Sequence, residues 1–186
     1  MAQQSINYGT TVNDGTGDNL RNAFIKTDDN FNELYAKDAN FIPVYASCGM
    51  TANATATTIA VTGTYYPISG TVTAGNVSSG ITTNAAGKIT YTGTDTRHFH
   101  IVSNFDMTTA SNSQITSFRW YKNGVAISRP VERKVGTGSD IGAASLHADA
   151  MLSTNDYLEL KVTNLTSAST ITVKNLYLFV MGFIMA

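Results

Sequence analysis

The stretch "STITVKNLYLFVMGFIM", residues 169–185, decides the fold more than any other part of this chain. It is long enough for one strand, and the side chains of a strand point alternately to its two faces. One face would carry Leu176, Leu178, Val180 and Ile184, and the other Tyr177, Phe179, Met181 and Phe183. Both faces are therefore apolar, whereas a strand in a two-layer sandwich ordinarily keeps one face in water.

The second apolar face needs cover, because monomers rarely expose large apolar patches. Burying each of its side chains fully contributes roughly 1.5–3 kcal/mol. Two explanations stay open: a subunit interface, or cover by another element of the same chain. We favour the interface, made by Tyr177, Phe179, Met181 and Phe183.

Working back from this strand, a period-two pattern runs through residues 41–186. Ala56–Ser69 predicts one or two strands, and Gly80–Gly93 predicts a hairpin. The pair Asn123-Gly124 lies between two β runs and is a strong hairpin signal. Phe118 and Trp120 share a strand face, which makes Trp120 a core residue. We expect one all-β sandwich domain over residues 41–186.

Residues 1–40 form a separate N-terminal segment with a different pattern. Residues 1–17 show no periodicity, which predicts a flexible polar arm, and a helix is expected from Asn19 to about Lys37 with Asp18 as its N-cap. Apolar residues recur along it at steps of four and three, with Thr27 filling one step, as in a coiled-coil seam. These residues are Leu20, Phe24, Phe31 and Leu34.

A helix this short is marginal alone in water, so its apolar stripe must pack against something. It could pack on its own β domain, or on copies of itself or a docking protein. We favour the second explanation and predict that residues 1–40 anchor and trimerise the chain.

Composition excludes several classes of protein. Only 13% of residues are charged and the net charge is -1, so we expect no nucleic-acid partner. The most basic run, Arg129–Lys134, is interpreted as a solvated strand face. Cys48 is the single cysteine, which rules out an intrachain disulfide and a cysteine-ligated zinc site. We predict no signal peptide, and the apolar residues 176–186 are too few to span a membrane as a helix.

Two segments resemble known families. "NDGTGDNLRNAFIKTDDNFNELY" resembles the N-terminal segment of many tailed-bacteriophage structural proteins, which precedes fibre, baseplate or head-appendage domains. The matching residues are Asp14, Gly15, Thr16, Gly17, Asp18, Leu20, Arg21, Ala23, Phe24, Lys26, Asn30, Phe31, Glu33, Leu34 and Tyr35. The rest is similar to the jelly roll of the tumour-necrosis-factor and C1q families, through "AAGKITYTG", "KNGVAI" and "LSTNDYLELKVTN…ITVKNLYLFVMGF". The second resemblance implies a threefold trimer.

Candidate chemical groups are few. His98 and His100 lie two residues apart on one strand face and are weak candidates for metal ligands, but no carboxylate in that strand would orient their rings. His147 and Asp149 lack a G-x-S-x-G partner, which argues against a hydrolase. We predict no catalytic residue, no bound metal and no cofactor.

Some other features have a structural interpretation. The Gly-rich run Val135–Gly142 lacks the ending of a phosphate loop and is expected to be a plain loop. The aromatic pairs Tyr65-Tyr66 and Trp120-Tyr121 could form a sugar-binding shelf, although we favour packing.

The sequence therefore predicts a non-enzymatic structural protein of the virion, assembled in the bacterial host cytoplasm. We expect a homotrimeric capsid decoration, head-fibre or small tail-appendage protein, anchored to capsid, baseplate or tail proteins by its N-terminal segment. The alternative is a receptor-binding tail-fibre knob that recognises a host surface glycan or protein.

Overall fold

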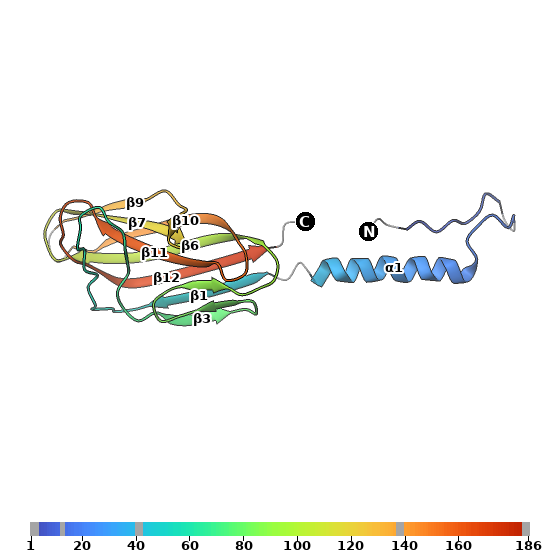
Figure 1. Cartoon of the computed structure of the whole chain (residues 1–186), viewed down its shortest axis with the longest axis horizontal. Coiled ribbons are helices and arrows are strands. Elements are labelled where there is room, and N and C mark those ends of the chain that lie inside the picture. Colours follow the sequence, from blue (N-terminus) through green and yellow to red (C-terminus); the bar gives the residue numbers. More distant parts are fainter. Residues whose placement is uncertain (1–3, 12–13, 40–42, 137–139, 184–186) are drawn as a thin grey trace. The chain divides into compact units, whose positions relative to one another are not determined.

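The computed structural model describes residues 4–11, 14–39, 43–136 and 140–183 (Figure 1). Its contacts divide the chain into two compact units, Met1–Ile42 and Pro43–Ala186. Ile184, assigned above to one face of the last strand, lies outside the described residues, as does part of the Gly-rich loop.

The larger unit is a sandwich of two antiparallel sheets, so the predicted all-β fold is confirmed. Sheet A has the strand order β10-β6-β12-β1-β3 (Figure 1). Its strands are β1 (Val44–Met50), β3 (Thr73–Val77), β6 (Arg97–Thr109), β10 (Gly142–Leu152) and β12 (Ile171–Phe183). The last strand therefore lies in the middle of sheet A, between β6 and β1.

Sheet B has the strand order β4-β5-β11-β7-β8, with β2 beside β11 and β9 beside β7. Its strands are β2 (Tyr66–Pro67), β4 (Ile81–Thr83), β5 (Ile89–Tyr91), β7 (Gln114–Lys122), β8 (Val125–Ala126), β9 (Val131–Val135) and β11 (Tyr157–Asn164). The two sheets share one hydrophobic core.

Aromatic side chains join the two sheets through this core. The Phe105 ring on β6 stacks on the Phe118 ring on β7, with centroids 4.0 Å apart. Tyr91 on β5 meets Phe99 on β6 edge-on, with centroids 5.2 Å apart. Trp120 is fully buried, which confirms its predicted core position. The large apolar residues at alternate positions of β6 and β7 therefore point into the interior of the sandwich.

Both predicted hairpins are confirmed. Tyr121 pairs with Ala126 and Lys122 with Val125 around Asn123 and Gly124, which both have positive φ as a tight two-residue turn requires. The other hairpin joins β4 to β5.

The prediction of extended strand across Ala56–Ser69 is largely wrong. Only Tyr66–Pro67 forms a strand, and Thr57 makes an isolated bridge to Ile171. A turn interrupts the segment, because Gly63 has positive φ and the Thr64 N–H donates to the Val61 carbonyl at 3.1 Å.

Asp156 fixes the turn between β10 and β11. Burial alone would raise the pKa of Asp156, but Lys122 at 2.8 Å and hydrogen bonds from the Ser153 N–H and the Asn123 amide hold it below its usual value. This carboxylate therefore ties the β7–β8 turn to the start of β11.

Candidate assembly surfaces

The N-terminal unit consists of one helix, α1 (Leu20–Ala39), and an arm that runs back along it. The Asn30 side-chain amide accepts a hydrogen bond from the Gln4 N–H and donates one to the Gln4 carbonyl, both at 2.9 Å. The Lys26 ammonium donates to the Ser5 carbonyl at 3.1 Å and to the Asp18 carboxylate at 2.6 Å. The prediction of a free, flexible arm is therefore wrong for the described residues, because side chains of the helix fasten it.

The turn between arm and helix is organised by Asp14. Its carboxylate accepts hydrogen bonds from the N–H groups of Thr16, Thr11 and Thr10 and from the Thr10 hydroxyl, at 2.7–2.9 Å. These bonds, with that from the Thr16 N–H strongest, hold the pKa of Asp14 well below its usual range. A Cβ at Gly17 would lie 2.9 Å from the backbone of Tyr8 and Gly9, so this position needs glycine.

The helix begins one residue later than the predicted cap implies. The Asn19 side chain accepts from the Asn22 N–H at 2.8 Å, so Asn19 is the N-cap. Asp18 was predicted as the cap, but its carboxylate accepts from the Asn7 N–H and pairs with Lys26. The bonds from Lys26 and from the Asn7 N–H lower the pKa of Asp18.

Within the N-terminal unit, the arm does not cover the apolar stripe of the helix. Each of its four side chains exposes more than half of its surface: Leu20, Phe24, Phe31 and Leu34. Tyr35 stacks on Phe31 with ring centroids 6.4 Å apart and widens the stripe. The half-buried residues Ala23, Lys26, Thr27 and Asn30 lie on the flank where the arm runs. The arm therefore leaves the large apolar side chains free.

The outward face of sheet A is the second apolar surface. Along β12 this face carries the predicted interface residues: Tyr177 and Phe183 are exposed, and Phe179 and Met181 are half-buried. The opposite face, with Leu176, Leu178 and Val180, is in the core. The side chains of β12 therefore point to two faces as predicted. No element among the described residues buries the outward face completely.

Neighbouring strands extend this face with residues that sequence reasoning missed. Register places Tyr45 of β1 beside Met181, and Val102 of β6 beside Phe179. Met151 at the end of β10 is 47% exposed and lies opposite His98. Their alternation along each strand was visible in the sequence, but the order of strands in the sheet was not.

A groove of about 1260 Å³ borders the same face. Its lining is mixed, with polar residues such as Asn104, Asp106 and Asn175 beside apolar ones such as Met50 and Tyr177. Asp106 accepts two hydrogen bonds from Asn175, one from its N–H at 3.0 Å and one from its amide at 2.7 Å. The apolar face therefore continues into a groove of mixed polar and apolar lining.

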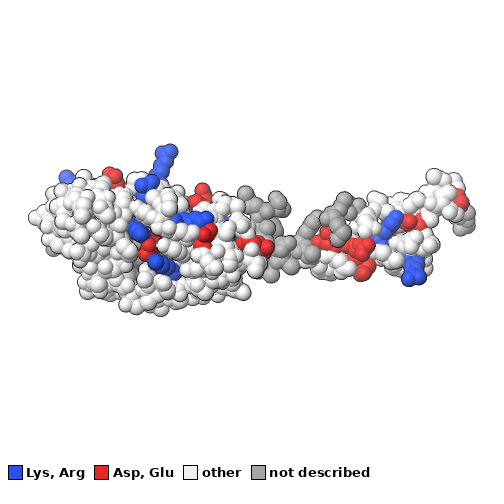
Figure 2. Space-filling view, in the orientation of Figure 1, with Lys and Arg blue, Asp and Glu red and all other residues white. Residues whose placement is uncertain are grey.

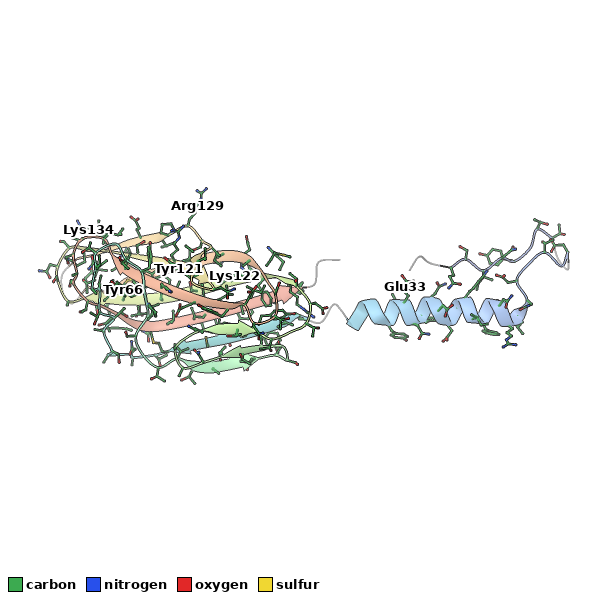
Figure 3. All side chains as sticks on the ribbon, viewed as in Figure 1. Glu33, Tyr66, Tyr121, Lys122, Arg129 and Lys134 are labelled. Carbon is green, nitrogen blue, oxygen red and sulfur yellow. The ribbon has the colours of Figure 1, made fainter. Side chains whose placement is uncertain are left out.

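Charge distinguishes the two sheets. The outward positions 143–151 of β10, 98–108 of β6, 175–183 of β12 and 45–49 of β1 include no Lys, Arg or Glu, and their acidic residues are Asp106 and Asp149. Sheet B instead presents Arg119, Glu132, Lys134 and Lys161. Charged side chains are scattered over the view of the sandwich in Figure 2, and Arg129 projects from the surface in Figure 3. Charge depletion with aromatic and Met enrichment is typical of the core of an interface.

The side chains considered for metal binding or thiol chemistry, His98, His100 and Cys48, all belong to sheet A. His98 and His100 both lie on the outward face of β6, and the ring of His100 lies next to that of His147 on β10. Among the described residues, no group of three or more His, Cys, Asp or Glu side chains is placed to hold a metal ion. Cys48 is buried, which raises the pKa of its thiol to about 11.

Two aromatic residues lie together on the outside of sheet B. The rings of Tyr65 and Tyr121 have centroids 5.8 Å apart, and the Lys161 ammonium lies 4.9 Å from the Tyr121 centroid. The Tyr65 hydroxyl is 2.8 Å from the Ser117 hydroxyl. Packing and a sugar-binding shelf were the two explanations considered for these aromatic residues. Trp120 packs in the core, whereas Tyr65 and Tyr121 face outward.

None of the helices in the described part of the chain is long and apolar enough to cross a membrane. A jelly-roll sandwich with an exposed apolar sheet face, and an N-terminal unit with an apolar helix stripe that its own arm leaves open, are typical of a protein that works by assembly.

Several solved structures are similar to this chain. The structure of Eiger TNF from S. frugiperda is similar with a TM-score of 0.50 and 10% identity, over 77% of this chain and 95% of that one. PRD1 vertex protein P5 gives 0.48 at 16% identity, over 76% and 97%. The globular domain of zebrafish complement 1qA protein gives 0.42 at 12% identity, over 77% and 98%. The Eiger likeness supports the predicted TNF-like fold.

Curated protein sequences gave no match. The family described as "Bacteriophage T4 gp9/10-like protein, N-terminal" matches residues 3–175. Because this match covers most of the chain, the protein belongs to that family, and it is a structural protein of the phage particle.

Proposed function

We propose that this protein is a non-enzymatic, homotrimeric appendage of the virion, a capsid decoration, head-fibre or small tail-appendage protein. In this proposal sheet A forms the subunit interface, and the N-terminal unit docks on a capsid, baseplate or tail protein. Assembly takes place in the bacterial host cytoplasm. The chain acts without a cofactor and without nucleic-acid or membrane partners.

The observation that supports this proposal is the difference in composition between the outward faces of the two sheets. Sheet B faces outward with Lys, Arg and Glu side chains, whereas the outward face of sheet A offers Tyr177, Phe179, Met181 and Phe183. A face that carries large apolar side chains and no Lys, Arg or Glu gains from burial at a smaller cost in desolvation than the outward face of sheet B would. Threefold closure would cover this face in every subunit, which a monomer cannot do.

The N-terminal unit supports the anchoring role. Its polar signature residues act within the unit, since Asp14, Asp18, Lys26 and Asn30 hold the arm and turn. Its large apolar residues remain exposed. A docking surface that is already folded loses less conformational entropy on binding than a free tail would. Three such units in one trimer would add avidity.

The test is incorporation into phage particles. We compare the full wild-type chain with the double variant Phe24→Ser/Phe31→Ser, and use Arg21→Ser/Asn32→Ser on the polar side of the same helix as the matched control. Light scattering measures the mass of each purified protein, and quantitative mass spectrometry measures its copies per particle. We expect all three proteins to be trimers, with only the Phe24/Phe31 variant missing from particles. Unchanged incorporation of that variant would overturn the anchoring role.

A second candidate function is a receptor-binding tail-fibre knob. The observation that favours it is the outward pair Tyr65 and Tyr121 on sheet B, next to the Lys161 ammonium. Paired aromatic faces and a cation suit a host surface glycan or protein epitope. Many copies on the capsid lattice would support decoration, whereas a few copies confined to the tail, with host binding lost in Tyr121→Ala, would support the knob.

A further inference from the structure

All three histidines of the chain lie on the outward face of sheet A. His98 and His100 are on β6, and His147 is on the neighbouring strand β10. Register pairs His100 with Asp149 and His147 with Val102, so His100 and His147 are diagonal neighbours. Their ring centroids are 5.4 Å apart, with 47° between the ring planes.

This separation is the one that two imidazoles take when they share a tetrahedral metal ion. A Zn–N bond of about 2.0–2.1 Å plus roughly 1.1 Å from nitrogen to ring centre places the metal about 3.2 Å from each centroid. At a tetrahedral angle the two centroids are then roughly 5 Å apart. Both side chains are exposed, so packing into the core does not dictate the contact.

The chain leaves the rest of the coordination shell open. Within the described residues no third His, Cys, Asp or Glu completes a cluster around this pair. Zinc, nickel and copper(II) accept imidazole ligands readily, and a two-ligand site leaves positions for water or for another protein chain. The face on which the pair lies is the one that the proposed trimer brings against neighbouring copies.

We propose that His100 and His147 form a two-histidine site for a divalent transition-metal ion of the zinc or nickel type, located at the subunit interface. The interface location rests on the proposed trimer, whereas binding by the pair does not. The sequence alone favours a different pair, His98 and His100, because they are two residues apart on one strand. The pairing of β6 with β10 selects His147 instead.

The experiment uses the full chain, freed of metal by a chelator and titrated calorimetrically with zinc chloride and with nickel chloride near neutral pH. The variants are His100→Gln and His147→Gln, and His98→Gln is the matched control from the same strand. We expect wild type and His98→Gln to bind one ion per chain. Each of the other two should lose at least about tenfold in affinity, since loss of even an outer-shell partner costs that much.

Absence of binding in wild type, or an equal loss in His98→Gln, would overturn the metal inference. Thermal unfolding of each metal-free variant shows that the exchange leaves the fold intact. Light scattering on the same samples separates the two proposals. A wild-type monomer with histidine-dependent binding would overturn the interface location and keep the site. A trimer without histidine-dependent binding would overturn the site and keep the trimer.

Discussion

Replacing Phe179 by aspartate tests the subunit interface most directly. Phe179 is half-buried at the centre of the outward face of β12, between Ser47 and Val102. Four other side chains on this face of sheet A expose 37–49% of their surface: Tyr45, Met151, Tyr177 and Phe183. Burying what remains exposed contributes roughly 0.5–1.5 kcal/mol for each of them. An unpaired carboxylate in a closed interface costs roughly 3 kcal/mol or more. One such carboxylate in each subunit thus cancels the gain from at least two of these side chains.

We expect the Phe179→Asp trimer to dissociate at protein concentrations at which the wild-type trimer is still intact. The protein concentration at the midpoint of dissociation should rise by about two orders of magnitude or more. Sedimentation velocity over a concentration series measures this shift. Tyr121→Asp on sheet B introduces the same charge on the other face and should leave the trimer intact. Circular dichroism verifies that both variants remain β-sandwiches. A Phe179→Asp variant that stays trimeric at the wild-type dissociation range would refute the interface on sheet A and assign trimerisation to the helix.

Three further predictions concern the fold. Asn30→Ala should free the arm, so that hydrogen exchange at the Gln4 N–H rises while the melting of the sandwich is unchanged; equal protection in both proteins would contradict the clamp. The pKa of Asp156 lies below its ordinary 3.8, so its stabilisation is complete above that pH and is lost as the pH falls through the lower, folded-state value; Asp156→Asn should flatten the acid limb of the stability curve measured in urea. Gly182→Ala places a Cβ 2.6 Å from the Phe99 ring and should lower the free energy of unfolding by roughly 1–3 kcal/mol, which a denaturant titration would detect and an unchanged midpoint would disprove.

Local periodicity was enough to predict the sandwich and the doubly apolar last strand. Alternation along β12 identified both faces because each side chain's direction follows from its position in the strand. Asn123-Gly124 identified its hairpin because few residues tolerate positive φ at both central positions. These features depend on residues that are close together in the sequence. They can therefore be predicted without knowledge of the tertiary structure.

What could not be predicted depends on pairing over long sequence distances. Nothing in the sequence of His100 or His147 says that β6 and β10 are neighbours, so their contact was missed. The same holds for Gln4 and Asn30, which meet only because the arm turns back. Asp18 and Asn19 are both good N-caps by type, and Lys26 decides between them because it pairs with Asp18 and leaves the cap to Asn19.

The reversed arm decides where a reporter can be attached. Gln4 is held beside Asn30, and Asn30 lies about 15 Å along the helix from its first residue. A fluorescent or affinity label attached at Gln4 would thus lie near the middle of the helix, one turn from Leu34, and not at the end formed by the Asp14 turn. Such a label would obstruct the surface that it was meant to report on. Arg129, which projects from the sandwich between β8 and β9, is the better position for imaging this protein on the particle (Figure 3).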